Sequence, residues 1–173
     1  EQQVKSWSLL VAVAATVVMC YSLGFAFDAG NKEFSAQWLP QLGASFSLQM
    51  DGAAVLLCLL TVIAYPLIFV ATWKSSYPSA HNFYALMLLT QAGILGVFLA
   101  ADGLLFYFFW ELALIPVYFL CSRWGGEKRI QVTFKFFIYT FLGSLLMLVG
   151  LLYLYYQTAD GSFSMQSLYS TKL

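Results

Sequence analysis

Five long apolar runs constrain this chain more than any other feature of its sequence. They lie at about residues 6–27, 51–73, 82–101, 103–122 and 130–156, and each is close to the ~20 apolar residues that a helix needs to cross a bilayer. In lipid the backbone has to satisfy its own hydrogen bonds, so a single span of this length is an α-helix. Only 9% of the residues are charged, against about 25% in a soluble domain. The sequence therefore predicts an all-α, polytopic transmembrane helix bundle with five spans.

The connections predict how these helices are arranged and where they begin. The third and fourth runs are separated only by a short link containing Asp102, which makes the two helices antiparallel neighbours. Asp51 and Asp102 stand just before apolar runs, where a carboxylate can cap a first turn. Pro66 lies inside the second run and predicts a kink or an unwound turn. The longest connection, 28–50, is predicted to be a surface loop in which the alternation at 46–50 favours a short strand.

The charged residues predict an orientation and exclude some partners. Because cytoplasmic connections carry an excess of Lys and Arg, the side richer in them is predicted to face the cytoplasm or the equivalent matrix compartment. The net charge is zero, which argues against a nucleic-acid partner. The richer side would hold Lys5, Lys74, Arg123, Lys128 and Arg129, and the other side Lys32 and Lys172 together with Asp28, Glu33, Asp102 and Asp160.

Glu111 is the most informative single residue, because it lies near the middle of the fourth apolar run. A carboxylate at that depth costs about 2.5–3.5 kcal/mol on insertion scales. Tyr107 at i−4 and Tyr118 at i+7 share its helix face, so two phenols can support the acid. Pro116 removes the helical hydrogen bond to the carbonyl of Leu112 and can admit water nearby. We interpret Glu111 as an intramembrane proton site; the alternative is a static, protonated and hydrogen-bonded acid.

Lys135 is the second charge within an apolar run, and it has two readings. It can extend its ammonium toward the cytoplasmic surface, or it can belong to a proton route. Lys135 lies nearer the surface than Glu111, which argues against a direct ion pair between them. Ala92, Gly96 and Ala100 form a small-residue stripe that predicts a helix-packing seam.

The sequence carries no pattern typical of a bound cofactor or metal. The three cysteines stand in separate apolar runs without a CxxC or Cys/His cluster, and there is no Gly-rich phosphate loop. No metal site is therefore expected on this chain.

Three motifs together resemble one family. Phe106-Tyr107-Phe108-Phe109-Trp110-Glu111-Leu112-Ala113-Leu114-Ile115-Pro116 is followed by Trp124-Gly125-Gly126 and then by Lys135-Phe136-Phe137-Ile138-Tyr139-Thr140. This combination resembles the antiporter-like subunit 4 (chain M in bacteria) of proton-pumping NADH:quinone oxidoreductase, respiratory complex I. The resemblance extends from about residue 4 to 156.

The resemblance implies an inverted-repeat antiporter-like fold, of which these five spans are the second to the sixth. It implies that Glu111 pairs with a lysine on a later helix, beyond residue 173, and is required for pumping. It also implies that NADH, FMN, the iron–sulfur clusters and quinone bind to other subunits, and that the partners are neighbouring antiporter-like subunits and the lipid bilayer. Because the chain starts without methionine, we expect a piece of a longer protein.

The expected function is thus proton translocation as a membrane subunit of an enzyme complex, through a half-channel coupled to quinone reduction. The expected location is the bacterial inner membrane, with the mitochondrial inner membrane as the alternative. Two other functions remain open: a subunit of a multisubunit cation/proton antiporter or membrane-bound hydrogenase, and a non-transporting membrane scaffold.

Overall fold

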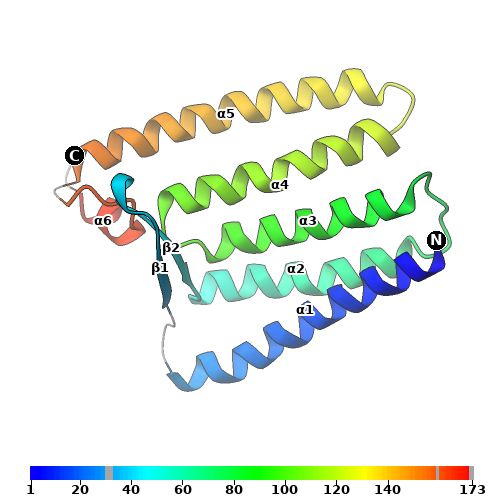
Figure 1. Cartoon of the computed structure of the whole chain (residues 1–173), viewed down its shortest axis with the longest axis horizontal. Coiled ribbons are helices and arrows are strands. Elements are labelled where there is room, and N and C mark those ends of the chain that lie inside the picture. The colour runs from blue at the N-terminus through cyan, green and yellow to red at the C-terminus, as the bar shows by residue number, and fades with distance from the viewer. Residues whose placement is uncertain (30–32, 159, 172–173) are drawn as a thin grey trace.

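Five long helices lie side by side in chain order and form one layered bundle (Figure 1). The computed structural model describes residues 1–29, 33–158 and 160–171, except for the side chains of residues 23–29. All five helices are long and apolar enough to cross a membrane, which confirms the predicted five-span bundle. They are α1 (Gln2–Ala29), α2 (Gly52–Ala71), α3 (Ala80–Leu99), α4 (Gly103–Trp124) and α5 (Arg129–Gln157), and a short α6 (Met165–Ser170) follows.

The two ends of the bundle differ in charge and in structure. The N-terminus and the α2–α3 and α4–α5 turns gather at one end, while a β-hairpin and α6 cover the other (Figure 1). Lys5, Lys74, Arg123, Lys128 and Arg129 all lie at or near the first end, as the sequence predicts. The side chain of Asp28 and residues Lys32 and Lys172 lie outside the described residues.

The predicted surface loop is largely a β-hairpin. Strand β1 (Glu33–Leu39) pairs antiparallel with β2 (Ala44–Gln49), and a 3-10 turn at Pro40–Leu42 joins them. The predicted strand at 46–50 is therefore confirmed, whereas a loop over 33–49 is wrong. Gly43 closes the turn with φ 65°, and a Cβ there would meet the carbonyl oxygen of Gly161 at 2.0 Å. Only glycine fits this position.

Asp102 joins the hairpin to α4. Its carboxylate is fully buried, and Oδ1 accepts hydrogen bonds from the backbone N–H groups of Leu104 and Leu105 at 2.9 and 3.1 Å. Oδ2 accepts bonds from the N–H and Oγ of Ser45 at 2.9 and 3.3 Å. Asp51 caps α2 through one bond of 2.7 Å. Both predicted caps are confirmed, and Asp102 adds a long-range connection.

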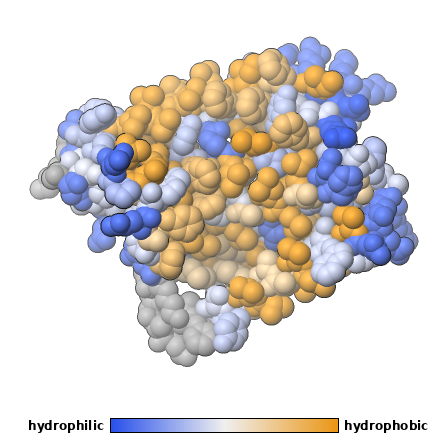
Figure 2. Space-filling view, viewed as in Figure 1, coloured by the Kyte–Doolittle hydropathy of each residue, from blue (hydrophilic) through white to orange (hydrophobic). Residues whose placement is uncertain are grey.

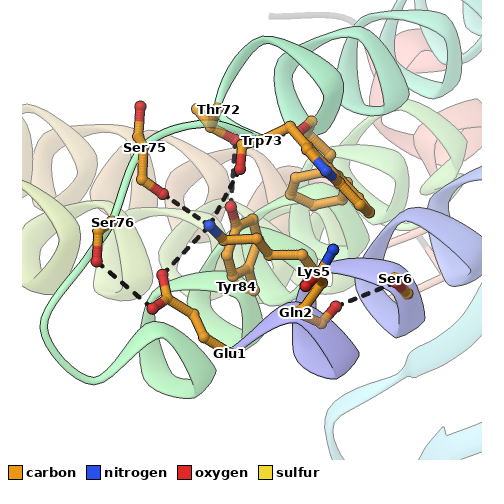
Figure 3. Close-up of polar contacts among 10 residues, drawn as sticks. Glu1, Gln2, Lys5, Ser6, Thr72, Trp73, Ser75, Ser76 and Tyr84 are labelled. Atoms are coloured by element: carbon orange, nitrogen blue, oxygen red, sulfur yellow. Dashed lines mark hydrogen bonds and ion pairs between the residues drawn. The ribbon is translucent and has the colours of Figure 1, made fainter.

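Lys5 fastens the start of α1 to the end of α2 (Figure 3). Its Nζ donates to the carbonyl oxygens of Trp73 and Ser75 at 3.1 and 2.8 Å and lies 3.2 Å from a carboxylate oxygen of Glu1. A cation suits this place because the carboxyl end of a helix carries partial negative charge. The hydrogen bond from Lys5 lowers the pKa of the Glu1 carboxyl. Lys5 therefore binds the carbonyl groups that follow α2, in addition to being one of the basic residues that predict the orientation in the membrane.

Helix α2 continues through Pro66 without interruption. The proline has no N–H, so the carbonyl of Val62 loses its usual helical donor. Thr16 of α1 replaces that donor, since its Oγ1 donates to the Val62 oxygen at 2.6 Å. A neighbouring helix thus satisfies the group that the proline frees.

Helices α3 and α4 approach each other closely at two glycines. A Cβ on Gly93 would meet the backbone of Ala113 at 2.9 Å, and a Cβ on Gly96 would meet the ring of Phe109 at 2.3 Å. The predicted small-residue seam is confirmed at Gly96 but wrong at Ala92, which is exposed. The seam shifts because Gly93, not its neighbour, faces α4.

Candidate functional site

Glu111 lies near the middle of α4, at least two helical turns from either end. Eight residues separate it from Gly103 and thirteen from Trp124, which corresponds to about 12 and 20 Å along the axis. Its Oε1 is buried and accepts no hydrogen bond from the residues that the structure describes. Almost all buried polar groups in proteins are hydrogen-bonded, so this oxygen lacks, within the described residues, the partner that a buried acid ordinarily has.

Tyr107 connects Glu111 with α5. Its phenol interacts both with the Glu111 carboxylate and with the hydroxyl of Ser144. Ser144 is buried, and its hydroxyl donates to the Phe141 carbonyl at 2.9 Å. Helix periodicity places Tyr107 beside Glu111, whereas Ser144 could not be found from the sequence without the packing register of α4 on α5.

Tyr118 contributes to the same seam between α4 and α5. Its ring packs against that of Phe137, with centroids 5.0 Å apart, and lies seven residues from Glu111 toward the basic end. This contact orients α5 on α4. A direct supporting role of the Tyr118 phenol at Glu111 stays a prediction.

Pro116 leaves a backbone acceptor close to the carboxylate. Helix α4 continues through this proline, which is fully buried. Its ring nitrogen cannot donate to the carbonyl of Leu112, the residue next to Glu111. Two acceptors, the Leu112 carbonyl and Glu111 Oε1, therefore lie within one helical turn.

Lys135 does not approach Glu111. It is exposed on α5, two residues before Phe137, which faces α4. Two residues correspond to a rotation of about 200°, so Lys135 lies on the side of α5 that points away from α4. A part for Lys135 in a proton route stays a prediction.

Helix α5 leaves most of its surface uncovered. Among the described residues only Thr133 and Ser144 of this helix are buried, and the space-filling view shows a predominantly hydrophobic surface between the two polar ends of the bundle (Figure 2). Lys135 and Tyr139 stand on this uncovered face. The face is suited to contact with lipid or further helices.

The described part of the chain contains no group of three or more His, Cys, Asp or Glu side chains that could hold a metal ion. Cys20, Cys58 and Cys121 are free thiols. The chemistry of the site is thus that of a carboxyl group, a phenol and a hydroxyl.

Comparison with known proteins agrees with this fold. Residues 100–172 match the family described as NADH:quinone oxidoreductase/Mrp antiporter, transmembrane. The F(420)H(2) dehydrogenase subunit M of Methanosarcina mazei is 42% identical over 97% of this chain and 35% of its own length. The NADH-quinone oxidoreductase subunit M of Escherichia coli is 33% identical over 99% of this chain and 37% of its own length.

Solved structures share the arrangement of the helices. A chain of respiratory complex I from Thermus thermophilus with bound NADH superposes with a TM-score of 0.87 at 29% identity, over 98% of this chain and 35% of that one. A chain of the Mrp complex from Dietzia has a TM-score of 0.80 at 19% identity, over 95% and 18% of the two chains, which shows the fold alone.

The five-helix layer defines a membrane protein of antiporter-like fold. Residues 100–172 carry the transmembrane domain of the NADH:quinone oxidoreductase/Mrp antiporter family, and the relatives named above, similar over nearly the whole of this chain, are called subunit M. The chain spans about a third of the length of these relatives.

Proposed function

We propose that this chain supplies an intramembrane proton-binding site, centred on Glu111, to a complex that couples quinone reduction to proton translocation. The buried Oε1 of Glu111, which accepts no hydrogen bond from the described residues, carries the proposal. A static structural acid would be expected to have its hydrogen bonds satisfied within the bundle. A site that gains and loses a proton needs a position for water or a mobile cation beside it.

The surroundings of Glu111 support two protonation states. A nearby cation would favour the carboxylate, and its withdrawal would favour the neutral acid, since burial disfavours charge. The Tyr107 phenol, which interacts with both Glu111 and Ser144, can donate to the carboxylate in one state and turn toward Ser144 in the other. A switch between these arrangements lets one site take up and release a proton.

The electron-transfer cofactors are proposed to lie on other subunits of the complex. Relatives of similar identity are named for different donors: F(420)H(2) in Methanosarcina mazei, NAD(P)H in Nostoc and NADH in Escherichia coli. All three carry the name subunit M or chain 4. A subunit shared by complexes with different donors does not need a donor site of its own, so we assign NADH, FMN and the iron–sulfur clusters to other subunits. The family resemblance extends this proposal to quinone.

The proposed partners are neighbouring antiporter-like membrane subunits and the lipid bilayer. The uncovered apolar face of α5 (Figure 2) supports this, since such a surface is stable only against lipid or protein. We place the protein in the bacterial inner membrane.

A cation/proton antiporter subunit is the second candidate. The fold match to the Mrp complex chain, together with a match to the membrane-bound sulfane sulfur reductase at a TM-score of 0.81 and 21% identity, favours a common scaffold. In that case proton uptake at Glu111 would follow a cation gradient rather than electron transfer.

The test replaces Glu111 by Gln in the full-length parent protein within its complex, with Asp51→Asn as a control at the exposed cap of α2. We expect quinone-dependent turnover and proton uptake by vesicles to fall on the order of a hundredfold in the Glu111 variant. Assembly should be retained, and the control should keep both activities. Unchanged turnover and proton uptake would favour a non-transporting scaffold, and uptake that requires Na⁺ instead of quinone would favour the antiporter.

A further inference from the structure

A second feature of the bundle lies beside α4. Helices α3, α4 and α5 enclose an open groove of about 270 Å³ that Glu111 does not line. On α4 the lining residues Ala113 and Val117 lie about 160° and 120° around the helix from Glu111. A third lining residue of α4, Leu114, lies only about 60° from Glu111, so the groove adjoins the face of α4 that carries Glu111 but is not lined by Glu111 itself.

The groove is apolar although two threonines line it. Thr90 donates its hydroxyl proton to the Leu86 carbonyl at 2.8 Å, and Thr140 donates to the Phe136 carbonyl at 2.6 Å. Both hydroxyls are thus engaged with their own helices. The remaining lining residues are apolar or aromatic, so the groove suits a hydrocarbon chain and offers little to a polar ligand.

Two aromatic side chains lie beyond the end of the groove that is nearest the basic side of the bundle. Phe83 stands seven residues before the lining residue Thr90, and Trp124 seven residues after the lining residue Val117. Seven residues are two helical turns, so each shares a face with its lining residue. The two rings meet edge to face with centroids 5.3 Å apart, as interfacial aromatic side chains often do.

Arg129 supplies charge above the same groove. It stands seven residues before Phe136, which lines the groove, and so shares its face about 10 Å nearer the membrane surface. Arg129 is exposed, and among the described residues it has no salt bridge. It opens α5, whose first turn receives no hydrogen bond from a side-chain cap. The first N–H groups of a helix attract anions. Lys128 adds a second cation and Glu127 one opposing charge in the same turn, so the turn keeps a net positive charge.

We propose that the groove is a binding site for an anionic phospholipid. One acyl chain would lie between α3, α4 and α5, and the phosphate would rest at Arg129 and the start of α5. The dimensions agree, because the groove-lining residues of α5, Phe136 and Thr140, lie about 10 and 16 Å below Arg129. They thus extend from the middle of one hydrocarbon leaflet, roughly 15 Å deep, to the bilayer centre. The positive rim over an apolar groove matches an anionic headgroup on a hydrocarbon chain, and it selects against zwitterionic lipids.

The experiment identifies what occupies the groove in the assembled complex. A photoreactive benzoylphenylalanine replaces Val117 in the groove or, as a matched position, Ile115, which is exposed on the opposite side of the same helix. The complex is irradiated in membranes containing phosphatidylglycerol and phosphatidylethanolamine, and mass spectrometry identifies the adducts. We expect phosphatidylglycerol to be enriched about fivefold at Val117 over Ile115, from the typical attraction of one basic residue.

Charge variants complete the test. Arg129→Gln should abolish the enrichment, Arg129→Lys should retain it, and Lys74→Gln, which removes an exposed cation from the α2–α3 turn at the same end, should leave it unchanged. Equal lipid composition at the two positions, or enrichment that survives Arg129→Gln, would overturn the proposal. An adduct between Val117 and a peptide would also overturn it, because a helix of the parent protein or another subunit would then fill the groove. Turnover is not measured, so the outcome is independent of the role of Glu111.

Discussion

Replacement of Asp102 by Ala should release the β-hairpin from the bundle. The carboxylate makes two strong contributions: it caps α4 through Leu104 and Leu105, and it holds Ser45 of β2. Loss of a cap typically costs about 1 kcal/mol. The 2.9 Å bond from the Ser45 N–H goes to a buried charged acceptor, for which about 2 kcal/mol is typical. Only the bond to Ser45 holds the hairpin, because the other bonds stabilise the start of α4.

Hydrogen exchange of the full-length parent protein in nanodiscs separates the two contributions. Since 1.4 kcal/mol is a factor of ten, the Ser45 amide should exchange about thirtyfold faster in the Asp102→Ala variant. Asp102→Asn keeps an oxygen for the α4 cap but turns an amide donor toward Ser45, so it should speed exchange in β2 more than in α4. Asp51→Ala removes a cap that does not touch the hairpin and is the control. Unchanged exchange at Ser45 would refute the assignment.

Two further substitutions test the packing of the helices. Gly93→Ala should prevent correct folding, because its Cβ would lie 2.9 Å from the α4 backbone. The control Gly143→Ala should be neutral, because its Cβ would meet nothing within 4 Å. The yield of folded protein after detergent extraction measures both effects. Thr16→Val should lower the free energy of unfolding by about 1 kcal/mol, because the Val62 carbonyl loses its donor. In a double-mutant cycle this cost should disappear in the Pro66→Ala background, where a backbone N–H is restored; an equal cost in both backgrounds would contradict the account.

Hydropathy and capping chemistry predict the helices well, because in a membrane each helix satisfies its own backbone. The span count and the caps Asp51 and Asp102 follow from such local signals. Strand β1 was missed although its apolar residues Phe34, Ala36 and Trp38 alternate with polar ones. The sequence analysis used the alternation only at 46–50, and the β1 residues are almost all exposed, so no buried face distinguishes this strand. The bond between Asp102 and Ser45 joins residues 57 positions apart, and no local pattern encodes it.

The candidate site also contains some residues that local sequence patterns predict and others that depend on helix packing. Helix periodicity predicts that Tyr107 lies beside Glu111, and this agrees with the structure. Ser144 required the register of α4 against α5, which depends on how side chains such as Tyr118 and Phe137 interlock. The cation beside Glu111 expected from the family resemblance is not supplied by Lys135, which points away from α4.

The central claim is that Glu111 changes its protonation state during turnover. Infrared difference spectroscopy of the full-length complex, recorded between the oxidised and quinol-reduced states, observes this directly through the carbonyl stretch of a protonated carboxylic acid. The account predicts a carboxyl difference band that disappears in the Glu111→Gln variant while the rest of the spectrum is retained. The same band at full intensity in both proteins would contradict it.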